Sequence, residues 1–170
     1  MRTSADEAEL SGESLEIWAS LATLLERLPA ALDAQLQADS GLTHFEYGLM
    51  YALSEAPERT LRMSTLAGFA NSTLSRLSRG IARLEKNQWV YRQPDPSDGR
   101  YTLAILTEEG AAKVEQSRPG HEALVQRVVF GALTKAQARQ LSTISERICA
   151  SISSVPAWKP TTRRSSSSDK

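Results

Sequence analysis

Four basic side chains recur at helical spacing in the middle of the chain, and the chemistry they suggest is the binding of a polyanion. They follow one another at intervals of three, four and three residues: Arg76, Arg79, Arg83 and Lys86. Apolar side chains recur at the same intervals, offset by two residues: Leu74, Leu77, Ile81 and Leu84. This pattern predicts an amphipathic helix that buries one stripe and presents cationic groups on the other.

The start of this helix is marked by short polar side chains at Asn71, Ser72, Thr73 and Ser75. Hydroxyl and amide groups at a helix start accept hydrogen bonds from the first free backbone amides. An isolated basic stripe is more often only a solvated helix face. The capped start and the segments on either side favour a binding helix over that alternative.

A second cationic feature follows the helix, on a predicted β-hairpin. Residues 90–93 and 101–106 are rich in β-branched and aromatic side chains and predict two strands. Between them lies the segment PDPSDGR, residues 94–100, whose two prolines and glycine predict a tip longer than a two-residue turn. Arg100 would then project from the hairpin, which suggests a helix followed by a wing that both contact nucleic acid.

The overall charge balance hides a strong division along the chain. The net charge is zero, with 20 basic and 20 acidic residues. Residues 1–58 carry a net −9, residues 59–100 a net +5 and residues 101–170 a net +4. A local basic surface matters for phosphate contact, not the global sum. The positive charge is centred where the helix and the hairpin are predicted.

The elements that must position these residues are mainly helices. Residues 14–40 predict a first helix with a kink or break at Pro29, and a capping box from Thr43 to Glu46 begins a second. A short strand near Arg62 and a brief helix capped by Ser64, with Leu66, Ala67 and Phe69 facing inward, precede the basic helix. After the hairpin, three helices are expected: one starts at Thr107 and ends near Pro119–Gly120, one spans 121–130, and one is capped by Thr134 and Gln137.

This order predicts a fold that is mainly α with a small β-hairpin wing: a winged helix-turn-helix flanked by N- and C-terminal helices. Residues 14–152 would form a single domain, with the winged region at 43–107 and the flanking helices at 14–40 and 108–152. Residues 1–13 and 156–170 are predicted to be disordered arms. The apolar stripe of the first helix has two open explanations, a core position or a subunit interface.

Composition and motifs argue against several other classes of function. No secretory signal and no run of about 18 apolar residues is visible, and the single Cys149 fits a reducing compartment, so the cytoplasm is expected. His121–Glu122 resembles the start of a zinc-protease helix, but Val125 stands where the second histidine would be. Neither an enzyme nor a metal or cofactor site is therefore predicted, and Cys149, next to Ile148, is expected to be a buried structural thiol.

The stretch from Leu61 to Gly110, LRMSTLAGFANSTLSRLSRGIARLEKNQWVYRQPDPSDGRYTLAILTEEG, resembles the MarR family of transcriptional regulators. Its most specific part is DPSDGRYTLAILTEEG, which is similar to the family's wing: an Asp-x-Arg tip, a returning strand and Leu-Thr-x-x-Gly. The resemblance in order of elements extends from about Ser14 to Ile152. Three details depart from the family's pattern: Pro29, Gly80 and Asn87–Gln88. Of the last pair, Asn87 is still able to adopt the left-handed cap, and Gly80 is consistent with close packing on a neighbouring helix.

The resemblance implies a homodimer whose terminal helices intertwine, a recognition helix in the major groove of double-stranded DNA and a wing in the adjacent minor groove. It also implies a repressor of a pseudo-palindromic operator that a small, often aromatic, ligand releases. The residues carried over to DNA binding are Ser72, Thr73, Ser75, Arg76, Arg79, Arg83, Asp98 and Arg100. Arg76 and Arg79 would read bases, Arg83 would contact phosphate, and Asp98 would orient Arg100.

Two alternatives remain open at this point. Trp18, His44 and Tyr51 are candidates for an effector site, although aromatic residues at helical spacing are more often core. The chain could also be a winged-helix module that binds protein and never touches DNA. The basic outer face of the predicted helix argues against that second alternative.

Overall fold

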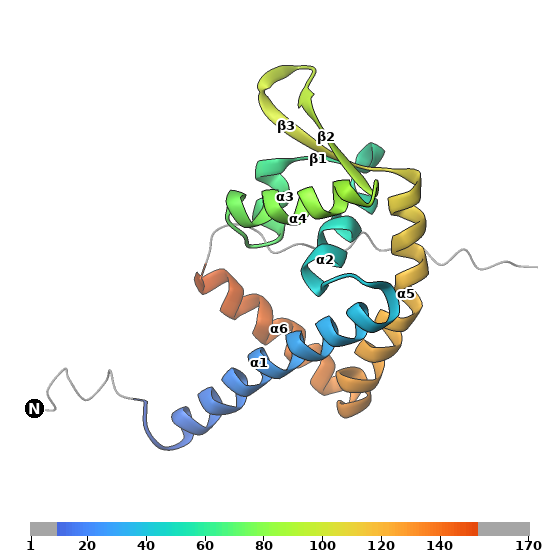
Figure 1. The fold of residues 1–170 in the computed structure, drawn as a ribbon. Helices are drawn as coiled ribbons and strands as arrows, with labels where there is room; N and C mark the ends of the chain where they lie inside the picture. Colours follow the sequence, from blue (N-terminus) through green and yellow to red (C-terminus); the bar gives the residue numbers. More distant parts are fainter. Residues whose placement is uncertain (1–9, 153–170) are drawn as a thin grey trace, which may run out of the picture.

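The computed structural model describes residues 10–152, and it contains six α-helices and a three-stranded antiparallel sheet. The arm predicted at 156–170 and most of the arm predicted at 1–13 lie outside these residues, but Gly12 and Glu13 belong to the first helix. Figure 1 shows the hairpin at the top, the helix-turn-helix below it and the long terminal helices at the base. The predicted fold class, a winged helix-turn-helix between helical ends, is confirmed.

The first helix, α1, spans Gly12–Ser40 and continues without interruption through Pro29. The predicted break there is wrong. Proline removes the donor to the carbonyl four residues earlier, which here belongs to the exposed Leu25. Water can satisfy that carbonyl, so the helix tolerates the proline. Gly41, in the left-handed conformation with φ 68°, ends the helix.

The second helix, α2, spans His44–Ser54 and lies at the centre of the domain. Its predicted capping box is present: the Thr43 hydroxyl accepts from the Glu46 amide, and the Glu46 carboxylate accepts from the Thr43 amide. The amide of His44 also donates to the Asp33 carboxylate of α1, at 2.9 Å. These bonds fix the start of α2 against α1.

A short 3₁₀ turn, Pro57–Arg59, leads into strand β1, Thr60–Arg62, and then into α3, Met63–Phe69. Arg62, not Ser64, precedes the first helical residue of α3, so the predicted cap is wrong. Leu66 and Ala67 are buried as expected, but Phe69 is 41% exposed. Asn71, with φ 43°, turns the chain toward α4, which spans Leu74–Lys86. Asparagine tolerates this left-handed backbone better than most residues.

The wing consists of β2, Val90–Asp95, and β3, Asp98–Leu106, and the sheet order is β1-β3-β2. The tip is a two-residue turn at Pro96–Ser97, so the prediction of a longer tip is wrong. The irregularity lies inside the hairpin instead. Asp95 pairs with Asp98 while Pro94 pairs with Thr102, and the three residues between them on β3 have no partner on β2. Arg100 is the middle residue of this bulge.

Helix α5 runs without a break from Glu108 to Val128, capped by Thr107 as predicted, and a 3₁₀ turn at Phe130–Ala132 follows it. The predicted end at Pro119–Gly120 is wrong for the same reason as at Pro29, because Pro119 and Glu115 are exposed. At Gly120 an added Cβ would lie 2.9 Å from the Asp39 carboxylate. The glycine therefore marks close packing of α5 on α1 and not a helix end.

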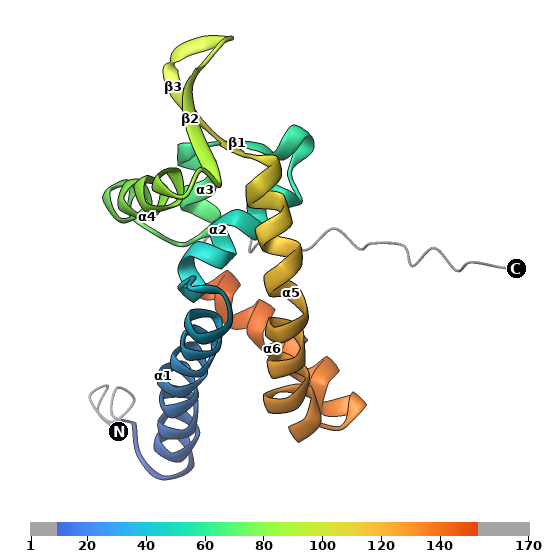
Figure 2. The ribbon, with the colours of Figure 1, turned by 45° about the vertical axis from the view of Figure 1, so that its right-hand side comes forward.

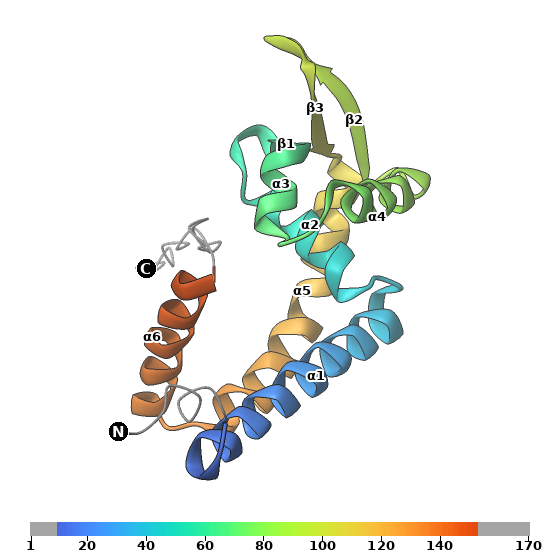
Figure 3. The same ribbon diagram turned by 90° about the vertical axis from the view of Figure 1, so that its left-hand side faces the viewer.

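Helix α6 spans Lys135–Ile152, and Thr134 and Gln137 form the predicted capping box at its start. It has no buried residue, and Cys149 is exposed in the single chain, which corrects the prediction of a buried thiol. Figure 3 shows α6 standing away from the body formed by α1, α2 and α5. Within residues 10–152, none of the helices has both the length and the apolar character that a membrane span requires.

One hydrophobic core joins α2, α3, α4, the sheet and the adjoining ends of α1 and α5. Its fully buried members include Leu36, Leu49, Leu66, Leu77, Ile81, Leu84 and Val114. Burying such a side chain stabilises the fold by roughly 1.5–3 kcal/mol. This core holds α4 and the wing in a fixed relation to each other.

Candidate nucleic-acid interface

Helix α4 has the two faces that its sequence predicts, with one exception. Leu77, Ile81 and Leu84 are buried, but Leu74 is 59% exposed because it lies at the first position of the helix, beyond the edge of the core. Arg76, Arg79, Arg83 and Lys86 are all exposed. Figure 2 shows α4 at the margin of the molecule with the wing rising above it, so both elements are free to contact a partner.

The N-terminus of α4 is capped by Thr73, whose hydroxyl accepts from the Arg76 amide at 3.2 Å. Ser72 and Ser75 lie beside it, Ser72 half-buried and Ser75 exposed. The free amides of a helix N-terminus attract anions, and the partial positive charge of the dipole adds to this attraction. The predicted polar start of the helix is therefore an exposed anion-attracting end.

The three arginines of α4 are in three different states. The Arg83 Nε lies 3.0 Å from a carboxylate oxygen of Glu46, which is buried. The Arg76 guanidinium lies 4.5 Å above the centroid of the Phe45 ring. Within residues 10–152, Arg79 makes no comparable side-chain contact. Arg83 thus ties α4 to α2, while Arg76 and Arg79 keep their hydrogen-bond donors available.

At the C-terminal end of α4 the backbone turns at Gln88, not at Asn87. Gln88 has φ 60°, whereas Asn87 has φ −91°, so Gln88 takes the left-handed conformation that was considered for Asn87. The Asn87 amide side chain instead donates to the Arg83 carbonyl at 3.0 Å. The turn lets the chain enter β2 directly.

Gly80 sits where α4 crosses α2. An ideal Cβ at this position would lie 3.0 Å from Phe45 Cε1 and 3.3 Å from Leu49 Cδ1. A side chain would therefore push the two helices apart. This close approach accounts for a glycine inside the helix, despite its cost of roughly 0.5–1 kcal/mol relative to alanine.

On the wing, Arg100 and Asp98 form the predicted ion pair. The Arg100 Nε lies 2.9 Å from Asp98 Oδ1, and a terminal nitrogen lies 2.6 Å from Oδ2. These hydrogen bonds hold the pKa of Asp98 below its usual range. The Arg100 side chain is 84% exposed. The pair presents a cation whose direction is fixed although it is surrounded by solvent.

The base of the wing tip is held by contacts that the local sequence pattern did not predict. Asp95 is buried, and it accepts hydrogen bonds from the Ser97 amide and hydroxyl and from the Arg62 guanidinium. The Ser97 hydroxyl, the Ser97 amide and Arg62 together lower the pKa of Asp95 to about 2. Arg62 also lies 4.3 Å above the Tyr101 ring. The Asp-x-Ser spacing is an Asx-turn signal that could have indicated part of this arrangement.

A second missed contact connects α4 to the wing. Arg92 of β2 donates from its Nε and a terminal nitrogen to the Glu85 carboxylate, at 3.0 and 2.6 Å, and from its other terminal nitrogen to the Ser78 hydroxyl at 3.2 Å. These bonds raise the pKa of Arg92 and lower that of Glu85. The helix and the hairpin therefore move as one unit.

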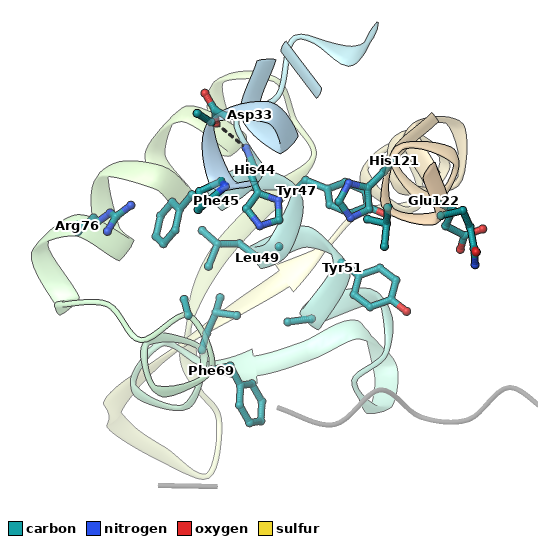
Figure 4. Close-up of a pocket in the computed structure, with 18 of the residues that line it drawn as sticks. Asp33, His44, Phe45, Tyr47, Leu49, Tyr51, Phe69, Arg76, His121 and Glu122 are labelled. Atoms are coloured by element: carbon teal, nitrogen blue, oxygen red, sulfur yellow. Dashed lines mark hydrogen bonds between the residues drawn. The ribbon is translucent and has the colours of Figure 1, made fainter. Parts of the chain in front are cut away.

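A cavity of about 1140 Å³ lies behind this surface, between α1, α2, α3 and α5. Its wall is mostly apolar, with His44, Tyr47 and His121 at one side (Figure 4) and Phe45 and Arg76 at another. Of the three predicted effector residues, His44 and Tyr51 line the cavity, whereas Trp18 lies on α1 outside it and is 49% exposed.

The two histidines stack with ring centroids 5.8 Å apart, and His121 also contacts the Tyr47 ring at 4.8 Å. Burial lowers the pKa of both histidines, and it raises the pKa of Tyr47 to about 12. The Nδ1 atoms of both histidines are buried, and within the described part of the chain neither has a hydrogen-bond partner. A molecule bound in this cavity would therefore meet two unpaired imidazole nitrogens and a mostly apolar wall that also includes Asp33, Arg76 and Glu122.

Comparisons with known proteins identify relatives over most of the chain. The MarR family model matches residues 42–102. The chain is 40% identical to Sco3205, a MarR family transcriptional regulator from Streptomyces coelicolor crystallised with DNA, with a TM-score of 0.83 over 89% of this chain and 100% of that one. AbsC, a second MarR family regulator from that organism, is 30% identical with a TM-score of 0.81, over 85% and 97% of the two chains. The transcriptional repressor YetL of Bacillus subtilis is 27% identical over 114 residues, 67% of this chain and 68% of YetL.

Proposed function

This chain belongs to the MarR family of DNA-binding transcriptional regulators, and from that premise we propose that it binds a pseudo-palindromic operator as a homodimer and represses transcription. The basic face of α4 supports this proposal most directly, because it is exposed while the opposite face is buried in the core. The name of YetL, a repressor, supports repression as the outcome. The cytoplasm is the proposed compartment, since such a regulator must reach the chromosome.

The residues of the interface divide by their surroundings. Arg76 and Arg79 keep free donors and are the proposed readers of base edges in the major groove, where one bidentate contact is worth roughly 1–3 kcal/mol. Ser72, Thr73, Ser75 and the N-terminus of α4 fix the register on phosphates. Arg83, already paired with Glu46, contributes a positive charge near the phosphate backbone.

The wing contributes the second contact. Arg100, oriented by Asp98, enters the minor groove beside the major-groove site. A narrow A·T-rich minor groove has an enhanced negative potential that attracts such a side chain. The bonds between Arg92 and Glu85 keep the wing at a fixed distance from α4, so the two contacts are made together.

The helical ends provide the symmetry. The exposed apolar side chains of α1 and α6 are the proposed interface with a second copy, and their two-fold pairing would place two α4 helices about one turn of DNA apart. This arrangement predicts half-sites spaced by about 10 base pairs.

We further propose that the cavity takes a small aromatic effector that releases DNA. Its volume is large enough for a drug-sized molecule, and its wall combines apolar side chains with His44 and Tyr51. Because Phe45 and Arg76 also line it, an occupant would lie directly against the DNA-reading helix. The effector acts only if it binds the two states of the dimer with different affinity. The protein is proposed to have no catalytic role.

The decisive experiment is selection of genomic DNA fragments with the purified full-length protein, followed by titration at several salt concentrations. We expect an enriched pseudo-palindromic motif and a steep loss of affinity with salt, because neutralising each phosphate releases a counterion. Retention that depends neither on sequence nor on salt would contradict DNA recognition and favour a protein-interaction module.

A further inference from the structure

We infer that Phe45 is a positioning residue for sequence recognition: its ring holds the Arg76 guanidinium in the plane from which Arg76 reads DNA. The inference rests on the proposed role of Arg76 as a base reader. Phe45 itself lies on α2, behind the interface, and need not touch DNA. Figure 4 shows the Phe45 ring beside the Arg76 side chain, with His44 and Leu49 on the same helix.

An arginine side chain can be held in place either by a partner that occupies its N–H donors or by one that leaves them free. A guanidinium has five N–H donors, and a carboxylate partner occupies two of them in a bidentate pair. Arg92 illustrates this case, because it donates from its Nε and a terminal nitrogen to the Glu85 carboxylate. Arg76 is held instead by its face over the Phe45 ring, at 4.5 Å from the ring centroid. A stacked guanidinium keeps its donors at the edge, free for a base.

The Phe45 ring is held rigidly in place by its own helix and by α4. Phe45 is in the first turn of α2, where the capping box and the hydrogen bond that the His44 amide donates to the Asp33 carboxylate fix the backbone. The ring edge meets α4 at Gly80, where an ideal Cβ would lie only 3.0 Å from Phe45 Cε1. The absence of a side chain at Gly80 therefore leaves room for the ring. Phe45 is consequently a fixed platform and not a mobile surface ring.

Arg79, the other proposed reader, differs from Arg76 in its surroundings. In the described part of the chain, Arg79 has no aromatic platform and no ion-pair partner, so it loses more side-chain entropy when it binds a base. Arg76 is already oriented before DNA arrives. Preorganisation of this kind increases the penalty for a wrong base more than it increases general affinity for phosphate. Phe45 therefore affects discrimination between sequences.

The test uses the full-length protein, its selected operator, an operator with the base pair read by Arg76 replaced, and a random duplex. Phe45→Leu removes the ring but keeps an apolar side chain. We expect its discrimination between the two operators to fall by about threefold to thirtyfold, the range of a lost cation–π contact, while affinity for the random duplex stays within about twofold. Phe45→Tyr retains a ring and should retain discrimination.

Two further variants separate positioning from stability. Gly80→Ala presses on the ring without removing it, and we expect it to lower discrimination although alanine favours the helix. Trp89→Leu is the matched control, because it removes another partly buried ring, which lies under Lys113 at 5.3 Å and away from Arg76. It should keep discrimination even if it lowers the urea midpoint. If Phe45→Leu does not fold, Phe45→Met replaces it as the ringless variant.

Combination with Arg76→Ala decides the mechanism. If Phe45 acts through Arg76, Phe45→Leu should cost no further discrimination in the Arg76→Ala background. An equal cost in both backgrounds, or equal losses on the operator and on the random duplex, would overturn the inference. Loss of discrimination in Arg76→Ala with full discrimination in Phe45→Leu would also overturn it and leave the proposed function standing. If Arg76→Ala itself discriminates normally, the base-reading role fails, and the inference fails with it.

Discussion

The winged region buries its apolar side chains within the chain, whereas the helical ends leave theirs exposed. Within the winged region, α2, α3, α4 and the sheet enclose a continuous core, with only the adjoining parts of α1 and α5 added. At the ends, the N-terminal half of α1 and the whole of α6 expose their apolar side chains, among them Leu15, Trp18, Leu25, Ile144 and Ile148. The winged region therefore buries its apolar surface within one chain, whereas the ends resemble one half of an interface.

The largest expected effect comes from the ends. Ile144→Asp places a charge in the exposed apolar stripe of α6, and we expect the dimer to dissociate. Operator affinity should then fall by about 100-fold or more, because the two half-sites are no longer bound together. Sedimentation velocity and operator titration measure both changes. Ala150→Asp adds the same charge on the opposite side of α6 and should leave the dimer intact. A fully dimeric Ile144→Asp protein would show that α6 is not the interface.

Within the winged region, two leucines of the same helix should differ sharply. Leu77→Ala opens a cavity in the core and should lower the free energy of unfolding by about 2–5 kcal/mol. Leu74→Ala shortens an exposed side chain three residues earlier and should change the free energy of unfolding by no more than about 0.5 kcal/mol. Urea unfolding at one protein concentration compares them. Similar losses at both positions would mean that a partner also covers Leu74.

A smaller effect is expected at the wing. Arg100→Ala should weaken operator binding by roughly tenfold, the value of one hydrogen bond to a charged group. The loss should be greatest where the flanking minor groove is narrow and A·T-rich. Titration of operators with A·T-rich and G·C-rich flanks measures this difference. Arg127→Ala removes the same charge from the last turn of α5 and serves as the control. Wild-type affinity of Arg100→Ala on both flanks would exclude the wing from recognition.

The smallest effect concerns the base of the wing tip and depends on pH. Hydrogen bonds from Ser97 and Arg62 lower the pKa of Asp95 to about 2 in the folded protein. The stabilisation is therefore complete above the unfolded pKa of about 3.9 and is lost as the pH falls toward 2. Asp95→Asn should have a lower urea midpoint than the wild type at pH 7, and the gap should narrow between pH 4 and pH 2. A gap that is constant with pH would assign the effect to packing alone.

Local signals in the sequence predicted the starts and types of most elements. The capping boxes at Thr43 and Thr134 and the cap at Thr107 are present because four neighbouring residues are enough to form them. The predictions at Pro29 and Pro119 were wrong because the effect of a proline on a helix also depends on the surrounding fold. Proline costs a helix one hydrogen bond and a clash of its ring with the carbonyl four residues earlier. That carbonyl can turn toward water only where the fold leaves its face exposed, as it does at Leu25 and Glu115.

Local sequence patterns did not predict the contacts between segments that are distant in the chain. The bond between Arg62 and Asp95 joins residues 33 positions apart, and it helps to hold the turn that the sequence predicted as a longer loop. The exposure of Cys149 follows from α6 standing apart from the core, which no local pattern around the cysteine reveals. In both cases the missing information was which element packs against which.

Helix α4 shows, for single side chains, the same contrast between what local sequence predicts and what packing determines. Its sequence alone determined that residues 74–86 form a helix with an apolar and a cationic stripe, because period and composition are local properties. Only the tertiary structure decided that Arg83 pairs with Glu46, that Arg76 lies over Phe45 and that Arg79 has neither contact. The partners of the first two belong to α2, 37 and 31 residues earlier in the chain, and burial of the shared core brings them to α4.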